Sequence, residues 1–494
     1  MVLGAILVVA AILRLEGIGA HLSDAEGYSY LVGSAPSASA FLRRLAAYEN
    51  TPPLFYLLLT PLPLGHTAWL RMPAAIPGAL IPLALYAALR RPLGAPTALL
   101  AAAMTAVAPF AVSYSDYSRG FMLENLACVL ALWAMLRLAG GASARWWWLY
   151  VSTGVVAVYS EYLAVIFLVA LTIATVASGK RDRLRTAALG LLPLLALLPW
   201  AGQFERGQDA VNHTKLSPTF AGPSVSSLRD VTVRLVLGEH GAGATPGLRS
   251  LEFVAVLAVL AAIVVILRRS AQPRTNAALI VGATGVLVLV GHVLAALFVT
   301  DIFNERYLTV LIPIGAALLA AAISRANRRW LWRLAVVAVA IIGVAVFVQR
   351  FGRQYQPDLA PVRTVVAALH PRRVLTNSAV VAYYLRRLPV VLDRPFGLGP
   401  GLQRSCPSSC VIVDDSRVPG GVRQATGPSK TIGPFDVRLL LPTANRAAAG
   451  SARRQGARRR VGEGEEHRRG GIPTTAVVWT HAHLRIRARG RNAF

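Results

Sequence analysis

The stretch AWLRMPAAIPGALIPLALYAALRRPLGAPTALLAAAMTAVAPF (residues 68–110) decides the fold class of this chain. It holds most of two apolar runs, 67–89 and 94–113, separated by a short turn that carries Arg90 and Arg91. Each run is close to the length of about 17 to 25 residues with which a helix crosses the hydrocarbon core of a membrane. The stretch therefore predicts two membrane-spanning helices joined by a short basic turn.

The same apolar pattern recurs along most of the chain. The 494 residues are 55% hydrophobic and only 15% charged, whereas about a quarter of the residues in a soluble protein are charged. Residues 146–178 are too long for one crossing, so we expect a turn at YSEY (159–162), with Glu161 exposed there. About eleven candidate spans result. They are 2–19, 67–89, 94–113, 120–138, 146–159, 162–178, 185–202, 251–267, 276–300, 307–324 and 331–349.

Basic residues gather in alternate connections between these segments. Positive charges in short loops mark the cytoplasmic side, so the first segment is expected to run outwards. The outer side then receives the long loops 20–66 and 203–250 and most acidic clusters near the apolar segments. We predict a multi-pass plasma-membrane protein with its site on the extracytoplasmic side. The basic connections contain Arg90 and Arg91, Arg137 and Arg145, and residues 180–185, 268–274 and 325–333.

The first outer loop is predicted to form a platform of helices on the membrane surface. Residues 37–50 (SASAFLRRLAAYEN) show apolar and basic residues at helical spacing, as in an interfacial helix. Residues 51–65 (TPPLFYLLLTPLPLG) are apolar but too short to span the membrane, which favours an interfacial or re-entrant segment. The platform carries the polar candidates Asp24, Glu26, Glu49 and Asn50.

The sequence changes character after the last apolar segment. Residues 350–442 alternate helix-like and short β-branched runs, which predicts a small extracytoplasmic α/β domain behind a transmembrane catalytic domain, 1–349. Cys406 and Cys410 lie there, either as a local disulfide or as free thiols. The remainder, 443–494, is a basic, low-complexity stretch and is predicted to be disordered.

The formal net charge of +28 comes largely from the basic connections and the tail, so nucleic acid is not expected as a partner. The N-terminal segment is expected to stay as an anchor, because it lacks a basic region before it and a clear cleavage site. No phosphate-binding glycine loop and no dinucleotide or zinc motif is found, so we expect no nucleotide or flavin cofactor. The need for a divalent metal is left open.

The order of motifs resembles the GT-C glycosyltransferases, and family 39 most closely, with its protein O-mannosyltransferases, lipid A aminoarabinose transferases and bacterial relatives. The resemblance implies transfer of a sugar from a polyprenyl-phosphate carrier to a protein, glycan or lipid acceptor at the outer face. It favours a hexose, especially mannose. It rests on acidic residues after the first segment, TPPLFYLLL (51–59), Leu70, Arg71 and Pro73, the stretch 109–123, and ERYL (305–308).

The chemistry of that reaction assigns roles to charged residues near the outer helix ends. One carboxylate must take the proton of the acceptor hydroxyl, and we predict Asp24 or Glu26 for this step in a single inverting displacement. Cations must hold the phosphate as it leaves, and Arg306, Arg119 and Arg71 are predicted to do so. Asp116 would orient the site or hold a divalent ion. Other candidates are Glu305, Tyr307, Glu161, Tyr117 and Asn50.

Three positions depart from the family pattern. Ala25 stands where the family has the Asp of an Asp-Glu pair, Thr51 where it has a His, and Tyr117 where it often has an acid. Glu305, Arg306 and Tyr307 match without adjustment. Two alternatives therefore stay open: a non-catalytic GT-C-like membrane subunit, and a transporter or lipid flippase. A transporter would place ionisable or broken positions at mid-membrane, whereas the charges here cluster at the outer helix ends.

Overall fold

The computed structural model describes most of the chain up to residue 440. The described residues are 1–49, 51–178, 182–203, 205, 224–237, 254, 275–298, 304–326, 328–350, 359–369, 371, 373–376, 378–388, 390–392, 410–415, 429–432 and 435–440.

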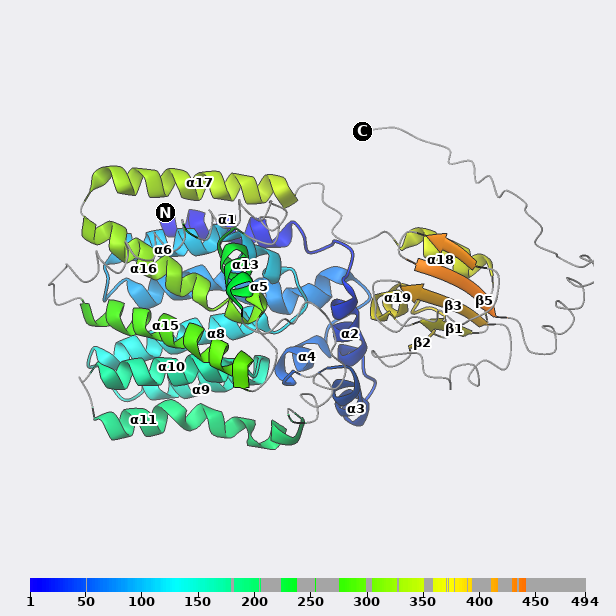
Figure 1. Cartoon of the computed structure of the whole chain (residues 1–494), viewed down its shortest axis with the longest axis horizontal. Helices are drawn as coiled ribbons and strands as arrows, with labels where there is room; N and C mark the ends of the chain where they lie inside the picture. Colours follow the sequence, from blue (N-terminus) through cyan, green and yellow to red (C-terminus); the bar gives the residue numbers. More distant parts are fainter. Residues whose placement is uncertain are drawn as a thin grey trace, which may run out of the picture. The chain divides into compact units, whose positions relative to one another are not determined.

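The described helices between residues 2 and 350 are mostly apolar and form a bundle (Figure 1). In chain order they are α1 (Val2–Leu15), α5 (Thr67–Leu89), α6 (Ala95–Val107), α7 (Pro109–Ser115), α8 (Phe121–Ala139), α9 (Trp146–Ser160), α10 (Ala164–Ala177), α11 (Arg183–Leu191) with the 3₁₀ helix η1 (Leu192–Trp200), α13 (Val225–Leu237), α15 (Thr275–Phe298), the 3₁₀ turn η3 (Glu305–Leu308), α16 (Leu311–Ala326) and α17 (Arg329–Arg350).

Ten of the eleven predicted spans are helical among the described residues. The eleventh, 251–267, lies outside them apart from Val254. Among the described residues, five helices are long and apolar enough to cross a membrane alone, and α6 with α7 is a sixth candidate, bent by 59°. The bend falls at Pro109, whose ring cannot continue a helix. Helices α1, α10 and α16 are apolar but shorter. The helical part is thus the expected polytopic membrane fold.

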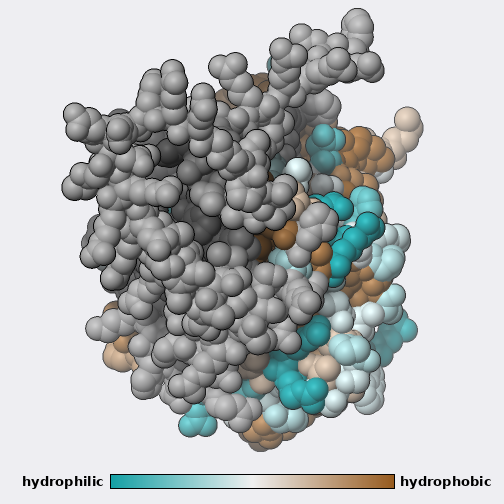
Figure 2. All heavy atoms as spheres, turned by 90° about the vertical axis from the view of Figure 1, so that its right-hand side faces the viewer, coloured by the Kyte–Doolittle hydropathy of each residue, from teal (hydrophilic) through white to brown (hydrophobic). Residues whose placement is uncertain are grey.

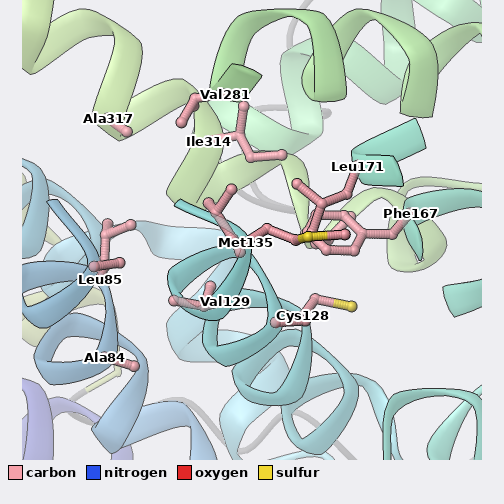
Figure 3. Close-up of a cluster of buried hydrophobic side chains, with 14 of the residues drawn as sticks. Ala84, Leu85, Cys128, Val129, Met135, Phe167, Leu171, Val281, Ile314 and Ala317 are labelled. Atoms are coloured by element: carbon pink, nitrogen blue, oxygen red, sulfur yellow. The ribbon is translucent and has the colours of Figure 1, made fainter. Parts of the chain in front are cut away.

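The centre of the bundle is a close-packed apolar core. Figure 3 shows Met135 of α8, Phe167 of α10 and Ile314 of α16 converging in it, with Cys128 on the same α8. Helix α8 also packs along α5 and α9. The outward faces are apolar too: on α17, Ile341 and Val344 are each 63% exposed. Apolar side chains on both sides of a helix are typical of a bundle in lipid.

The first helix carries a buried charge. Arg14 is fully buried and donates hydrogen bonds to Oγ of Ser115 (3.1 Å) and to the carbonyl oxygens of Ala106 (2.9 Å) and Ala10 (3.0 Å). A Cβ on Gly78 of α5 would lie 2.2 Å from the Ser115 hydroxyl, so only glycine permits this approach. Arg14 therefore ties α1 to α6 and α7.

The two ends of the bundle differ in charge. Arg90 caps the C-terminus of α5, and Arg137 in the last turn of α8 lies within electrostatic range of Arg90, Arg91 and Arg145. Thr97 at the start of α6 hydrogen-bonds Ser324 near the end of α16 (2.7 Å). The basic connection that follows α16 therefore begins at the same end of the bundle. We call this the basic end. The acidic residues discussed below lie at the other ends of these helices, called here the acidic end.

Three short helices gather at the acidic end: α2 (Asp24–Gly33), α3 (Ala38–Tyr48) and α4 (Leu54–Leu59). Ser23 and Ser37 cap the first two with their side-chain oxygens, which satisfies amides that a helix start leaves free. Helix α4 has only six residues and ends before Pro61, so it is too short to span a membrane. The predicted platform of short helices is therefore present.

A five-stranded sheet forms the C-terminal part of the described chain. Its strand order is β2-β1-β3-β5-β4, with β1 parallel to β2 and β3 and with β5 antiparallel to β3 and β4. Val374 of β1 pairs with Val390 and Val411. This confirms the expected α/β character. The elements are α18 (Ala360–Ala368), β1 (Arg373–Thr376), α19 (Ala379–Tyr384), β2 (Val390–Leu392), β3 (Cys410–Asp415), β4 (Ser429–Ile432) and β5 (Phe435–Leu440).

Figure 2 faces the side on which this sheet lies, and its coloured part mixes hydrophilic and hydrophobic residues. That mixture contrasts with the apolar sides of the long helices. The division into domains at 349 and 442 stays a prediction. Cys410 is the first residue of β3, but Cys406 lies outside the described residues. The two alternatives for these cysteines, a disulfide and free thiols, therefore both stay predictions.

Candidate functional site

Glu26 and Arg71 form a buried ion pair at the acidic end. Arg71 in the first turns of α5 donates to Glu26 through Nε (2.7 Å to Oε1) and Nη2 (3.0 Å to Oε2). Glu26 is 2% exposed and Arg71 is 4% exposed. This two-point geometry is the strong form of an arginine–carboxylate contact.

The remaining polar positions of this pair are also occupied. Glu26 closes a capping box with Ser23, accepting from its backbone N (2.8 Å) and Oγ (3.0 Å), and it accepts from the backbone N of Ser118 (3.1 Å). Arg71 donates further bonds to the carbonyl oxygens of Gly17 and His21. The pair thus joins α2, α5 and the loop before α8, and each partner already has several hydrogen bonds.

The other first-loop candidates have separate positions. Asp24 is the first residue of α2, and its side chain lies outside the described part of the structure, as does Asn50. Asp116 directly follows α7, is half-buried, and lies within electrostatic range of Arg71. The predicted roles of Asp24 and Asp116 stay predictions.

A second ion pair, Glu49 with Arg119, lies beside the first-loop platform. Nη1 of Arg119 donates to Oε2 of Glu49 and to the Tyr56 hydroxyl (2.6 Å), which also contacts Oγ1 of Thr51 (2.9 Å). Glu49 follows α3 and is 9% exposed, yet its Oε1 has no hydrogen-bond partner among the described residues. Burial raises the pKa of the Glu49 carboxyl, and the Arg119 guanidinium only partly opposes this rise.

Glu161 adds a second carboxylate to this pair. The turn predicted at YSEY is present between α9 and α10, but the expected exposure of Glu161 is wrong, because the side chain is only 5% exposed. Burial raises its pKa to about 7, although Arg119 and Arg306 pull it down. A Cβ on Gly120 would lie 2.4 Å from the Ser160 carbonyl oxygen. Glycine there lets the Arg119 loop approach the turn that carries Glu161.

The segment 304–308 brings a second arginine to Glu161. Asn304 caps η3, and its Oδ1 accepts from the backbone N (3.1 Å) and Nε (3.0 Å) of Arg306. Arg306 and Tyr307 act electrostatically on each other, on Tyr117 and on Glu161. Glu305 instead pairs with Arg234 of α13 (2.8 Å). We call Glu49, Tyr56, Arg119, Glu161 and Arg306 the two-arginine cluster.

A family model and several solved structures match this chain. The model of dolichyl-phosphate-mannose-protein mannosyltransferases matches residues 50–202, which carry Tyr56, Arg119 and Glu161. The chain is similar to ArnT from Cupriavidus metallidurans in its apo state, with a TM-score of 0.61 and 15% identity over 88% of this chain and 97% of ArnT. For ArnT bound to undecaprenyl phosphate, the TM-score is 0.58, with 14% identity over 89% and 97%. Among curated proteins, none matches this chain.

The chain has the GT-C glycosyltransferase fold. The resemblance inferred from the motif order is therefore confirmed.

Glu49 received too little weight in the prediction from sequence, and Tyr56 and Glu124 were missed as site residues. Tyr56 lies within the TPPLFYLLL segment (51–59) that carried the resemblance, and Glu49 lies two residues before it, so that segment was the available signal. Glu124 lies in the first turn of α8, is 3% exposed, and acts electrostatically on Glu161. Glu124 was missed because it lies within the predicted span 120–138, where site residues were not expected. The Ser-x-x-Glu pattern at 23–26 is also typical of a capping box. It indicates that the Glu26 side chain binds the backbone N of Ser23, as it does in the structure.

The described residues of this chain hold no group of three or more His, Cys, Asp or Glu that could hold a metal ion. Asp116 and Glu161 belong to different contact sets, one near Arg71 and one near Arg119. A divalent ion held by Asp116 stays a prediction.

Proposed function

We propose that this protein is a membrane glycosyltransferase that moves a sugar from a polyprenyl-phosphate carrier to an acceptor at the extracytoplasmic face. The observation that carries this proposal is the two-arginine cluster, where Arg119 and Arg306 lie around the buried carboxylates Glu49 and Glu161. It lies at the acidic end of the bundle, opposite the basic connections that indicate the cytoplasm. The match to a dolichyl-phosphate-mannose enzyme model and the undecaprenyl phosphate bound by ArnT support the same donor class.

The cluster suits a single displacement. The acceptor oxygen attacks the anomeric carbon, the bond from that carbon to the phosphate oxygen breaks, and the electron pair leaves with the phosphate. Arg119 and Arg306 stabilise the charge that builds on the phosphate, an effect that is large in a site shielded from water. A phosphate leaves as a stable anion, so one base for the acceptor proton is sufficient.

Two carboxylates remain candidates for that base. Glu26 already accepts bonds from Ser23, Arg71 and Ser118, so we assign Glu26 and Arg71 to positioning α2 against the bundle. Asp24 is the first-loop candidate. Glu161 is the second, because a carboxyl with a pKa of about 7 is partly deprotonated at neutral pH and binds protons well enough to remove one from a hydroxyl.

A hexose such as mannose is the proposed sugar, on the basis of the family model alone. A non-catalytic GT-C-like subunit is the second candidate, because Ala25 replaces the acid expected beside Glu26. The glycosyltransferase would consume a carrier-linked sugar donor, whereas the non-catalytic subunit would consume none.

The test is transfer by membranes that contain the wild type, Asp24→Ala, Glu161→Gln or both changes. They receive radiolabelled polyprenyl-phosphate mannose, then other carrier-linked sugars, with a mixed pool of acceptors. Glu16→Ala is the matched control, since Glu16 is an exposed acid at the end of α1. Loss of transfer in one single variant at equal expression names the base. No product from the wild type with any donor would instead favour the non-catalytic subunit.

A further inference from the structure

Four arginines gather at the basic end of the bundle, where two connections between helices meet. Helices α5 and α8 pack along each other, so the connection after α5 lies beside the one between α8 and α9. The Arg137 side chain, in the last turn of α8, lies within electrostatic range of the other three arginines. We call this set the basic-end cluster, and its members are Arg90, Arg91, Arg137 and Arg145.

The helices that carry the basic-end cluster supply no acid to offset its charge. Residues 66–115 and 125–160, which include both connections, contain no Asp or Glu. Asp182, in the basic connection before α11, is used as a helix cap and accepts from the backbone N of Leu184 (3.1 Å) and of Arg185 (3.3 Å). Among the described residues, none of the four guanidinium groups has an ion-pair or hydrogen-bond partner. Like charges repel at this range, so a bound anion would stabilise the cluster.

The Arg137 guanidinium is held in place without being neutralised. It lies over the Trp146 ring, with its Cζ 5.0 Å from the ring centroid, and the Trp146 ring packs on Trp133 of α8 with the centroids 5.3 Å apart. Nε of Arg137 is buried and has no hydrogen-bond partner among the described residues. The backbone N of Ala142 donates to the carbonyl oxygen of Arg137 (3.0 Å), which closes the loop onto the helix end. A guanidinium stacked on a ring keeps its N–H groups for a ligand.

An exposed apolar stripe of α5 leads to the basic-end cluster. Ile76, Leu80 and Leu83 are 53%, 42% and 38% exposed. Arg90 follows Leu83 by seven residues, which is about two helical turns, so the stripe and Arg90 share one face of the helix. Arg90 also ends α5 and lies beside the Tyr86 ring, 6.0 Å from its centroid. An acyl chain that lies along this stripe would therefore bring its headgroup to Arg90.

We propose that the basic-end cluster binds the phosphate of an anionic phospholipid such as phosphatidylglycerol. Arginine forks match phosphate oxygens at two points, and basic pockets between membrane helices bind anionic headgroups. The cluster lies at the opposite end of the bundle from the two-arginine cluster, so this lipid is neither the donor nor the acceptor of the proposed transfer. The proposal holds whether or not the protein transfers a sugar.

The test is native mass spectrometry of the full chain, titrated with phosphatidylglycerol and, separately, with phosphatidylcholine of the same acyl chains. The wild type should bind phosphatidylglycerol more tightly. Arg91→Gln/Arg145→Gln changes two exposed side chains and should weaken phosphatidylglycerol binding by roughly tenfold or more, since each arginine near a headgroup adds to the attraction. Arg329→Gln/Arg333→Gln is the matched control. It removes the same charge from exposed positions in the first turns of α17, at the same end of the bundle, and should leave the affinity unchanged.

Equal binding of the two lipids by the wild type overturns the proposal. So does an equal loss in the cluster and control variants, because the arginines would then act only through the total charge of that end. Inorganic phosphate at constant ionic strength should not displace phosphatidylglycerol, and displacement would assign the cluster to free phosphate instead. In thermal unfolding, phosphatidylglycerol should raise the midpoint of the wild type more than that of Arg137→Gln, since a ligand that binds the folded state stabilises it. Equal shifts in both proteins would show that the stacked guanidinium does not bind the lipid.

Discussion

The acidic end of this molecule holds two arginine–carboxylate pairs that differ in how completely their polar atoms are satisfied. In the pair Glu26–Arg71, the carboxylate accepts from a capping serine, a backbone amide and the two-point guanidinium. In the pair Glu49–Arg119, one carboxylate oxygen has no partner among the described residues. Two further charged groups, Glu161 and Arg306, lie within electrostatic range.

The difference teaches how to separate structural ion pairs from functional ones with the same composition. A buried polar atom without a partner costs free energy, and a ligand that supplies the missing contact is one explanation for such an atom in a native fold. The saturated pair has little left to offer a ligand. We therefore assign stability to Glu26–Arg71 and chemistry to the two-arginine cluster, and the following changes test that division.

The largest effect is expected from Glu26→Ala. It leaves the Arg71 guanidinium buried and without its carboxylate, which costs about 3–5 kcal/mol of folding free energy in comparable pairs. Denaturant unfolding of the detergent-solubilised protein measures the loss, and Glu16→Ala provides the exposed control. If Glu26→Ala is as stable as the wild type, the Glu26–Arg71 pair does not stabilise the fold and its assignment to stability is wrong.

Arg119→Gln should lower kcat/KM for transfer by about 10²–10³-fold, the usual cost of removing one donor to a developing negative charge. Its stability loss should be smaller than that of Glu26→Ala. Glu49 is left buried, but burial already raises its pKa, so it can take up a proton and become neutral. Transfer kinetics and unfolding are measured on the same preparation. Unchanged kinetics with a large stability loss would make both pairs structural.

Glu161→Gln should change the pH profile of transfer. A base works only when deprotonated, so the wild-type rate should fall as pH decreases through about 7, the value to which burial raises the Glu161 pKa. The Gln variant should be about 10²-fold slower and lack this acidic limb. Rates between pH 5 and 9 decide the matter. If the rate of the Gln variant still falls as the pH decreases through about 7, another titrating group causes the fall. Asp24→Ala would then be measured in the same way.

The smallest effect is expected from Gly120→Ala, which pushes the Arg119 loop away from the Glu161 turn. Its Cβ would meet the Ser160 carbonyl oxygen at 2.4 Å, and such overpacking costs about 1–2 kcal/mol. Gly19→Ala is the control, because nothing lies within 4 Å of a Cβ there. Thermal unfolding and transfer are compared. Equal behaviour of the two alanine variants would show that this close approach does not position the cluster.

The sequence predicted the helical bundle well because the length and apolarity of a span are local properties. The segments that became α5, α8 and α17 needed no knowledge of their neighbours. The role of each charge was harder to predict, because it depends on contacts between distant residues: Glu26 and Arg71 are separated by 45 positions. The turn at Glu161 was predicted, but its burial was not, because burial depends on segments distant in the sequence, such as the loop at Gly120 that lies against Ser160.

Arg14 has a consequence for how the protein is made. Its partners, Ala106 and Ser115, follow it by 92 and 101 positions, so they leave the ribosome well after α1. An arginine in a membrane helix is costly until it is paired. Helix α1 therefore cannot reach its final environment until α6 and α7 have been inserted, so for this helix the order of synthesis and the order of assembly differ.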